Sequence, residues 1–315
     1  METRTLASPP SILPLYARAA APMVPGASLL PFLPGRGKEI PEIELELPGV
    51  RPDPEKVAAY ARVCGFALRD SLPATYPMAL AFPLHMAVMA DGSFPFGAVG
   101  LVHVENRVEQ RRPVGLEEEL TIRVRPTKLK PHPRGQTFSL LTKVLSGRRI
   151  AWESTSTMLR RGKPAADRAD SGADGTKSEA DVPISARRPP EEGWPAGAEW
   201  ELGGDLGRRY AGVSGDRNPI HMHALTAKPL GFPRAIAHGM WTKARCLAAL
   251  ESRLPDAFGV DVRFRKPILL PARVKFASAG EGDEIDFEVR DAKRGTPHLE
   301  GRVSPLEAKT KDGRK

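Results

Sequence analysis

The segment Tyr210–His221 reads YAGVSGDRNPIH, and the segment Tyr60–Phe66, at an offset of 150, reads YARVCGF. A second pair of matching segments follows at an offset of 154, Arg111–Leu116 (RRPVGL) and Arg265–Leu270 (RKPILL). A looser echo lies between these pairs: Phe82-Pro83 and His85 against Phe232-Pro233 and His238. Matches in the same order at a nearly constant offset indicate an internal duplication with small insertions.

The two copies are expected to contain the same elements in the same order. Asp53-Pro54-Glu55 predicts a helix start, because an N-cap acceptor precedes a proline at the first helical position and an acid in the first turn. This helix should end near Gly65, and we expect Asp205 to cap its counterpart. Helical spacing of apolar residues predicts a second helix after Gly239 that stops before Pro255.

Strands are predicted where apolar and polar residues alternate, as in Val260–Arg265, Ile285–Arg290 and, in the first copy, Leu120–Val124. A helix followed by several antiparallel strands predicts an α+β fold with the sheet wrapped around that helix. Two such units side by side would join their sheets and leave a cleft between the halves.

Composition divides the chain of 315 residues into five parts. Residues 162–193 are rich in small and polar residues, which predicts a flexible linker. It separates a first folded block, 38–161, from a second, 194–305. Residues 1–37 form an N-terminal extension that lacks the pattern of a secretory signal, with a short surface helix predicted from Ile12 to Ala21. Residues 306–315 should be a disordered tail.

Bulk composition narrows the class of protein. Cys64 and Cys246 are the only cysteines, which excludes a disulfide framework and a four-thiolate metal site and fits a reducing cytoplasm. No apolar run reaches the roughly 18 residues of a membrane span. The net charge is +9, but basic residues are dispersed and aromatic residues make up only 6%, which disfavours nucleic acid. An anionic small molecule or carrier remains a candidate partner.

The second copy carries a polar pair, Asp216 and His221, five residues apart on a segment punctuated by Gly215 and Pro219. A carboxylate and an imidazole around one water form an acid/base pair that can add or remove a proton beside an activated carbon. The alternative is a structural turn, since Asp and Asn beside proline are standard turn residues. The first copy favours a catalytic role over a structural turn, because it lacks the polar pair: ungapped alignment places Phe66 opposite Asp216 and Ser71 opposite His221.

The helix start after Ala237–Met240 (AHGM) offers a second candidate feature. Free backbone N–H groups at a helix N-terminus can hold an oxyanion, and Gly239 would let a carbonyl group approach closely. His238 could equally be a capping or core histidine.

The run YAGVSGDRNPIH, followed by AHGM and by Phe264-x-Lys266-Pro267, resembles the MaoC-like family of (R)-specific enoyl-thioester hydratases and dehydratases. The resemblance is strong over 194–305. It extends more weakly to 38–161, since the order of a degenerate half and a motif-bearing half is similar to double-hotdog members. It implies a double hotdog, two sheets each wrapped around a central helix, that forms a pseudo-dimer.

The resemblance implies a cofactor-free hydro-lyase of fatty-acid metabolism. Asp216 and His221 would hold the water that adds to the β-carbon of a trans-2-enoyl thioester, and the Gly239 amide would hold the thioester oxygen. Ser214 and Asn218 would support them. The further residues expected to contact substrate are Tyr210, His238, Met240, Arg265 and Lys266. No metal ligand is expected. The carrier would be CoA or acyl carrier protein, and the chain a monomeric pseudo-dimer or a homodimer in the cytoplasm.

Two alternatives stay open, an acyl thioesterase and a non-catalytic acyl-thioester binder. In double-hotdog relatives the first half typically loses part of its central helix, making room for longer acyl chains. Gly92, Pro95 and Gly97 follow His85 closely, so no helix as long as the one after Gly239 fits there. We therefore expect a shortened helix and a roomy pocket for medium or long acyl chains.

Overall fold

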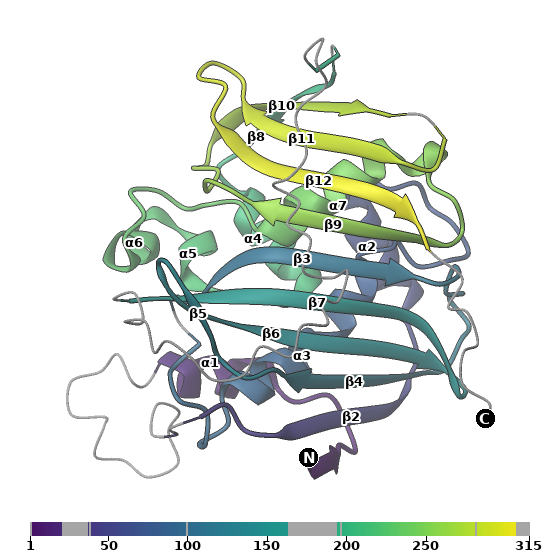
Figure 1. Cartoon of the computed structure of the whole chain (residues 1–315), viewed down its shortest axis with the longest axis vertical. Helices are drawn as coiled ribbons and strands as arrows, with labels where there is room; N and C mark the ends of the chain where they lie inside the picture. Colours follow the sequence, from purple (N-terminus) through teal and green to yellow (C-terminus); the bar gives the residue numbers. More distant parts are fainter. Residues whose placement is uncertain are drawn as a thin grey trace, which may run out of the picture.

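Two sets of strands join edge to edge into one twelve-stranded sheet (Figure 1). The computed structural model describes residues 2–20, 37, 39–98, 100–162, 194–195, 197–280 and 282–306. In sheet order, the first half contributes β1 (Glu2–Thr5), β2 (Ile43–Val50), β4 (Leu120–Pro126), β6 (Gly135–Ser146), β7 (Arg149–Arg161) and β3 (Val102–Gln110), with β5 (Lys130–His132) paired to β6. The second half continues with β9 (Phe258–Phe264), β12 (Pro297–Pro305), β11 (Ile285–Asp291), β10 (Ala272–Ala279) and β8 (Glu199–Leu202).

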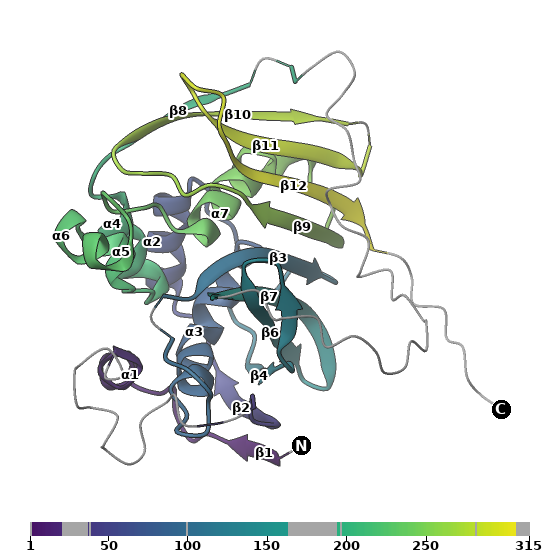
Figure 2. The same cartoon turned by 60° about the vertical axis from the view of Figure 1, so that its left-hand side comes forward.

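Four longer helices pack against one face of this sheet, as Figure 2 shows from the side. The first half supplies α2 (Pro54–Cys64) and α3 (Tyr76–Met89), and the second supplies α4 (Leu206–Ser214) and α7 (Gly239–Ala249). The other helices of the described residues are α1 (Ile12–Ala20), which has nine residues like α4, and four shorter segments: α5 (Pro219–Met222), α6 (Ala224–Ala227), η5 (Lys228–Leu230) and η6 (Glu251–Arg253). The predicted α+β architecture, with a sheet around helices in each half, is confirmed.

Helix α2 begins and ends as its sequence predicts. The Asp53 side chain accepts hydrogen bonds from the N–H groups of Glu55 and Lys56, and Pro54 takes the first helical position. Gly65 ends the helix with φ at 86°, in the left-handed region that favours glycine. Asp205 occupies the N-cap position of α4, as predicted. Its side chain makes no capping hydrogen bond, however, so the predicted side-chain cap is wrong.

The two halves meet across the antiparallel pair β3–β9, where Asn106 lies opposite Val262. Lys243, on α7, is fully buried at this seam and donates to the Asn106 side chain at 2.6 Å and to the Val260 carbonyl at 3.2 Å. Behind the sheet the repeated tyrosines approach each other, with the Tyr60 and Tyr210 ring centroids 5.9 Å apart. These tyrosines, which occupy matching positions in the two copies, thus lie close together where the two halves meet.

The expectation of a shortened helix in the first half is wrong. Helix α3 has 14 residues and α7 has 11, so α3 is the longer of the two. It starts nine residues before His85 and ends four residues after it, so the part that follows His85 is short, as expected. The glycines and prolines after Met89 end the helix, but Tyr76 and Pro77 start it earlier than the alignment with Gly239 suggests.

The N-terminal extension packs on the first half. Strand β1 pairs in parallel with β2, and α1 covers part of α3, with Leu15 only 9% exposed. The short helix predicted from Ile12 is confirmed. The predicted linker and tail lie outside the described residues, except for Gly162 and Leu306. Among the described residues no helix has the length and apolar character of a membrane span.

Candidate active site

The loop after α4 is shaped by local hydrogen bonds that aim its side chains. Gly215 adopts φ of 77° and ends the helix, which turns the chain toward the sheet. The Asp216 N–H donates to the Ser214 hydroxyl at 3.2 Å, and the Asn218 N–H donates to Asp216 Oδ1 at 3.1 Å. Asn218 then caps the short helix α5 through Ile220, so that Pro219 begins a turn that carries His221. Ser214 and Asn218 therefore order the loop that presents Asp216 and His221.

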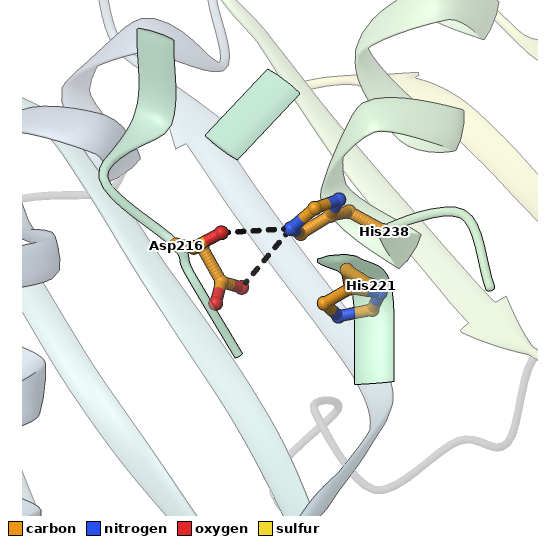
Figure 3. A group of neighbouring side chains, drawn as sticks. All are labelled: Asp216, His221 and His238. Carbon is orange, nitrogen blue, oxygen red and sulfur yellow. Dashed lines mark hydrogen bonds and ion pairs between the residues drawn. The ribbon is translucent and has the colours of Figure 1, made fainter. Parts of the chain in front are cut away.

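Three side chains converge at this point: Asp216, His221 and His238 (Figure 3). One nitrogen or oxygen atom from each lies within 4.8 Å of the others. The rings of His221 and His238 stack with centroids 3.6 Å apart. His238 Nε2 lies 3.0 Å from the Asp216 carbonyl oxygen and 3.9 Å from Oδ2 of the same residue. The predicted pair is brought together, and a third group, His238, joins it.

Hydrogen bonds to backbone carbonyls settle which imidazole nitrogens carry protons. His221 Nδ1 lies 2.8 Å from the Ile236 carbonyl, so Nδ1 must donate, and Nε2 keeps its lone pair. His238 Nε2 donates in the same way to the Asp216 carbonyl. His221 therefore offers an acceptor nitrogen, which is the form that a general base requires.

Burial sets the charges of the cluster. It lowers the pKa of His221 below its usual value and that of His238 to about 3, so both rings are neutral at neutral pH. Burial by itself would raise the pKa of Asp216, but attraction to His238 and His221 when they are protonated, and the hydrogen bonds that Asn218 and Tyr16 donate to Oδ1, lower it. Where both rings are neutral, the hydrogen bonds of Asn218 and Tyr16 are what favour the ionised carboxylate. The site thus holds an ionised carboxylate beside two neutral imidazoles.

The cluster lines a cavity of about 210 Å³ that both halves enclose. From the second half come Asp216, Asn218 and His221, and Gly239 and Met240 at the start of α7. The first half supplies a largely apolar wall: Met78, Phe82, Met89, Leu140 and Met158. The cleft expected between the halves is therefore present, and the apolar side chains of the first-half wall are accompanied by polar ones: His85, His103, Arg134, Ser156 and Arg161.

Gly239 takes the first position of α7, where backbone N–H groups have no acceptor within the helix. A Cβ atom at this position would lie 2.9 Å from the Phe264 ring, so a larger residue would collide with the cavity wall. Glycine therefore keeps the first turn of α7 open to a ligand in the cavity.

The residues predicted to contact substrate divide into two groups. His238, Met240, Arg265 and Lys266 line the cavity, although Arg265 also pairs with Glu300 at 2.6 Å. Tyr210 and Ser214 are not among the lining residues of this cavity. Tyr210 is 3% exposed, and its ring packs against that of His238 with centroids 4.8 Å apart, so it contacts the histidine and not the cavity.

Sequence reasoning missed two groups near the cluster. Tyr16, from α1, donates to Asp216 Oδ1 at 2.9 Å, and no local pattern around it marks it as part of a site. His103, from β3, lines the cavity beside Phe264, and burial lowers its pKa to about 4. Its position in an alternating strand could have indicated only that it faces inward.

A larger surface cleft of about 1170 Å³ adjoins the cavity and shares Lys266 and His298 with it. Its lining is strongly basic: Arg161, Arg234, Lys266, Arg273, Lys293 and Arg294, against the acids Glu201 and Asp291. An excess of cations beside a deep cavity suits an anionic group attached to the molecule that fills the cavity.

The fold and site define a double-hotdog protein with a carboxylate and two imidazoles gathered in its second half. The family profile described as a MaoC like domain matches residues 189–301. The chain is 37% identical over 298 residues to 3-hydroxyacyl-thioester dehydratase X of Mycobacterium tuberculosis, covering 94% of this chain and 99% of that protein. The chain therefore belongs to the MaoC-like family, as the sequence resemblance implied.

Solved structures agree with this assignment. The crystal structure of HtdX from M. tuberculosis superposes with a TM-score of 0.70 at 36% identity, over 84% of this chain and 100% of that one. A MaoC-like dehydratase from Phytophthora capsici, at 19% identity and a TM-score of 0.65 over 85% and 96% of the two chains, shares the fold. The chain is also similar to 3-hydroxybutyryl-CoA dehydratase of Methylorubrum extorquens, with 32% identity over 84 residues, which cover 27% of this chain and 49% of that protein.

Proposed function

We propose that the protein catalyses the reversible hydration of trans-2-enoyl thioesters to (R)-3-hydroxyacyl thioesters. The observation that carries this proposal is the ionised Asp216 carboxylate beside the unprotonated Nε2 of His221, in a cavity that apolar side chains of the first half also line. The family, and the dehydratase named among its close relatives, point to the same reaction. We assign the chemistry to residues 194–305 and the acyl chain to residues 38–161.

In hydration, Asp216 and His221 hold one water between them against the β-carbon of the enoyl group. The water oxygen forms the new bond at the β-carbon, and the proton that it loses passes through the carboxylate–imidazole pair to the α-carbon. Dehydration runs through the same steps in reverse: the α-proton leaves, the carbon–oxygen bond at the β-carbon breaks, and water is released. Acid/base pairs of this kind contribute roughly 10²–10⁴ in rate.

Negative charge develops on the thioester oxygen as the α-carbon gains or loses its proton. In this proposal the N–H of Gly239, at the start of α7, holds that oxygen, and the helix dipole adds to the positive potential there. This role also explains why the position holds glycine, since a side chain would displace Phe264.

The basic cleft is our proposed binding site for the anionic carrier of the thioester, CoA or acyl carrier protein. Lys266 lines both the cleft and the catalytic cavity, so it would lie where the acyl group joins its carrier. We further propose a cytoplasmic location, in keeping with two buried, unpaired cysteines.

The test is the loss of enoyl-thioester absorbance when protein is added to crotonyl-CoA and to longer enoyl thioesters on both carriers. Asp216→Asn and His221→Ala should each lower kcat by at least about 100-fold while thermal melting stays near that of the wild type. Activity should survive EDTA, since the pair needs no metal for this chemistry. Release of free thiol would instead identify a thioesterase, and binding without turnover a non-catalytic binder. Full activity in both variants would refute the assigned roles.

A further inference from the structure

The N-terminal helix α1 makes polar contact with the loop that carries Asp216 through the phenol of Tyr16. The Tyr16 hydroxyl lies 2.9 Å from Asp216 Oδ1, and it accepts a hydrogen bond from the Arg217 N–H at 2.7 Å. Because the Arg217 N–H points at the hydroxyl oxygen, the one phenolic hydrogen is free to point at the carboxylate. Burial, with the nearby charge of Asp216, raises the pKa of Tyr16, which keeps the phenol protonated as a donor.

This contact fixes one oxygen of the carboxylate and leaves the other available. Asp216 Oδ1 accepts from both Tyr16 and the Asn218 N–H, whereas Oδ2 faces His238 at 3.9 Å. Asp216 itself lines the cavity and Tyr16 is not among the lining residues. A carboxylate held by two donors on one oxygen cannot rotate freely, so its second oxygen keeps a constant direction toward the water and the imidazoles.

The helix that carries Tyr16 is anchored independently of this bond. Leu15 packs in the main core at 9% exposure, and Ile12 packs against Gly215, so that a Cβ atom on that glycine would lie 2.8 Å from Ile12 Cδ1. Upstream, β1 pairs with β2, and Arg4 forms an ion pair with Asp91 at 3.2 Å. The chain thus holds α1 in place on the first half and projects its phenol into the second.

We propose that Tyr16 is a positioning residue for Asp216, supplied by a segment that lies outside both copies of the duplication. The N-terminal extension would then be a working part of the active site. This inference rests on the proposed function, because it assigns a role in the same proton transfer.

The expected consequence of removing the phenol follows from the groups that face Asp216. These are Tyr16 from α1, Arg217 beside it in the loop, Tyr210 from α4, His221 from α5, His238 at the start of α7 and His103 from β3. Among them Tyr16 lowers the pKa of the Asp216 carboxyl by hydrogen bonding to its charged form. Without that donor the pKa should rise, and the carboxylate should also lose its fixed orientation.

The experiment compares Tyr16→Phe with the wild type on one enoyl-CoA across pH 3 to 8, a range that extends below 3.8 because the pKa of Asp216 is lowered from that value. We expect kcat to fall about 10- to 100-fold, the effect of losing one hydrogen bond to a charged group. KM should change little, because Tyr16 does not line the cavity, and the acid limb of the kcat profile should move to higher pH. Tyr76→Phe, which removes a phenol from α3, and Leu13→Ala, at a site on α1 that is 78% exposed, are the matched controls and should keep wild-type kinetics.

The outcomes separate this inference from the function beneath it. If the wild type hydrates enoyl thioesters and Asp216→Asn does not, but Tyr16→Phe keeps the wild-type kcat and acid limb, the positioning role is wrong. A Tyr16→Phe variant that loses kcat only in proportion to lost folded protein, with an unmoved acid limb, would reduce Tyr16 to a packing residue and also overturn the proposal. If the wild type itself is inactive toward every thioester, the proposed function fails first.

Discussion

Two buried histidines should make this protein sensitive to mild acid. His85, on α3, is 5% exposed and shares a 2.7 Å hydrogen bond with Thr142, and His238 is 2% exposed beside Asp216. Burial lowers the pKa of each to about 3, from an ordinary value of 6.5. The folded state therefore binds fewer protons than the unfolded chain, and the free energy of unfolding decreases as pH falls below 6.5, continuing toward pH 3.

The magnitude follows from the two pKa values. Protonation at pH 5 stabilises each unfolded histidine by about 2 kcal/mol, and the neutral, buried ring gains nothing from it. His85 and His238 therefore lower the free energy of unfolding by about 4 kcal/mol relative to pH 7.5, and His103, with a pKa of about 4, lowers it by about 2 kcal/mol more. Single domains are commonly stable by about 5–15 kcal/mol, so this is a large fraction. Carboxyls with a lowered pKa, such as Glu118 at about 2, contribute mainly below pH 5 and leave this window to the histidines.

Urea unfolding followed by tryptophan fluorescence at pH 5, 6, 7 and 7.5 measures this dependence. Replacing His85 by Gln should remove about a third of it or less, whatever the variant's own stability, because one of at least three titrating rings, His85, His103 and His238, is gone. The control His132→Gln, on the short strand β5, should leave the dependence unchanged. A change smaller than about 1 kcal/mol between pH 7.5 and pH 5 would show that the buried rings titrate normally, and would remove the argument for neutral imidazoles at the active site.

The remaining predictions concern substrate selection. Lys293→Glu combined with Arg294→Glu should raise KM for CoA thioesters severalfold at low salt and less at high salt, with kcat nearly unchanged. The control Lys130→Glu, on β5, should leave KM unchanged. An unchanged KM of the double variant at low salt would show that the carrier binds elsewhere. As the acyl chain lengthens beyond four carbons, kcat/KM should rise by about fourfold for each methylene buried against the apolar residues of the first half. Met158→Trp should abolish this gain. A profile that peaks at four carbons would contradict the assignment of the first half to the acyl chain.

The local features of this protein were readable from the sequence. The Asp53-Pro54 helix start, the glycine that ends α2, the alternating strands and the duplication all depend on neighbouring residues or on a repeat that the chain itself displays. The pairing of Asp216 with His221 was accessible for the same reason, since both lie on one short turn. Helix α3 was misjudged because it begins at Tyr76, whose ring packs against Tyr60 of α2, and the aligned copy, whose helix begins at Gly239, gave no information about that start.

The sequence alone determined that there are two related halves and that the second keeps a carboxylate and an imidazole, because periodicity and short spacing act over a few residues. Only the tertiary structure decided what surrounds that pair. Tyr16 lies 200 residues from Asp216 along the chain, and His238 and Lys243 meet partners on other elements. The pKa values, the tautomers and the shape of the cavity depend on burial and on groups brought together by packing, which no local pattern encodes.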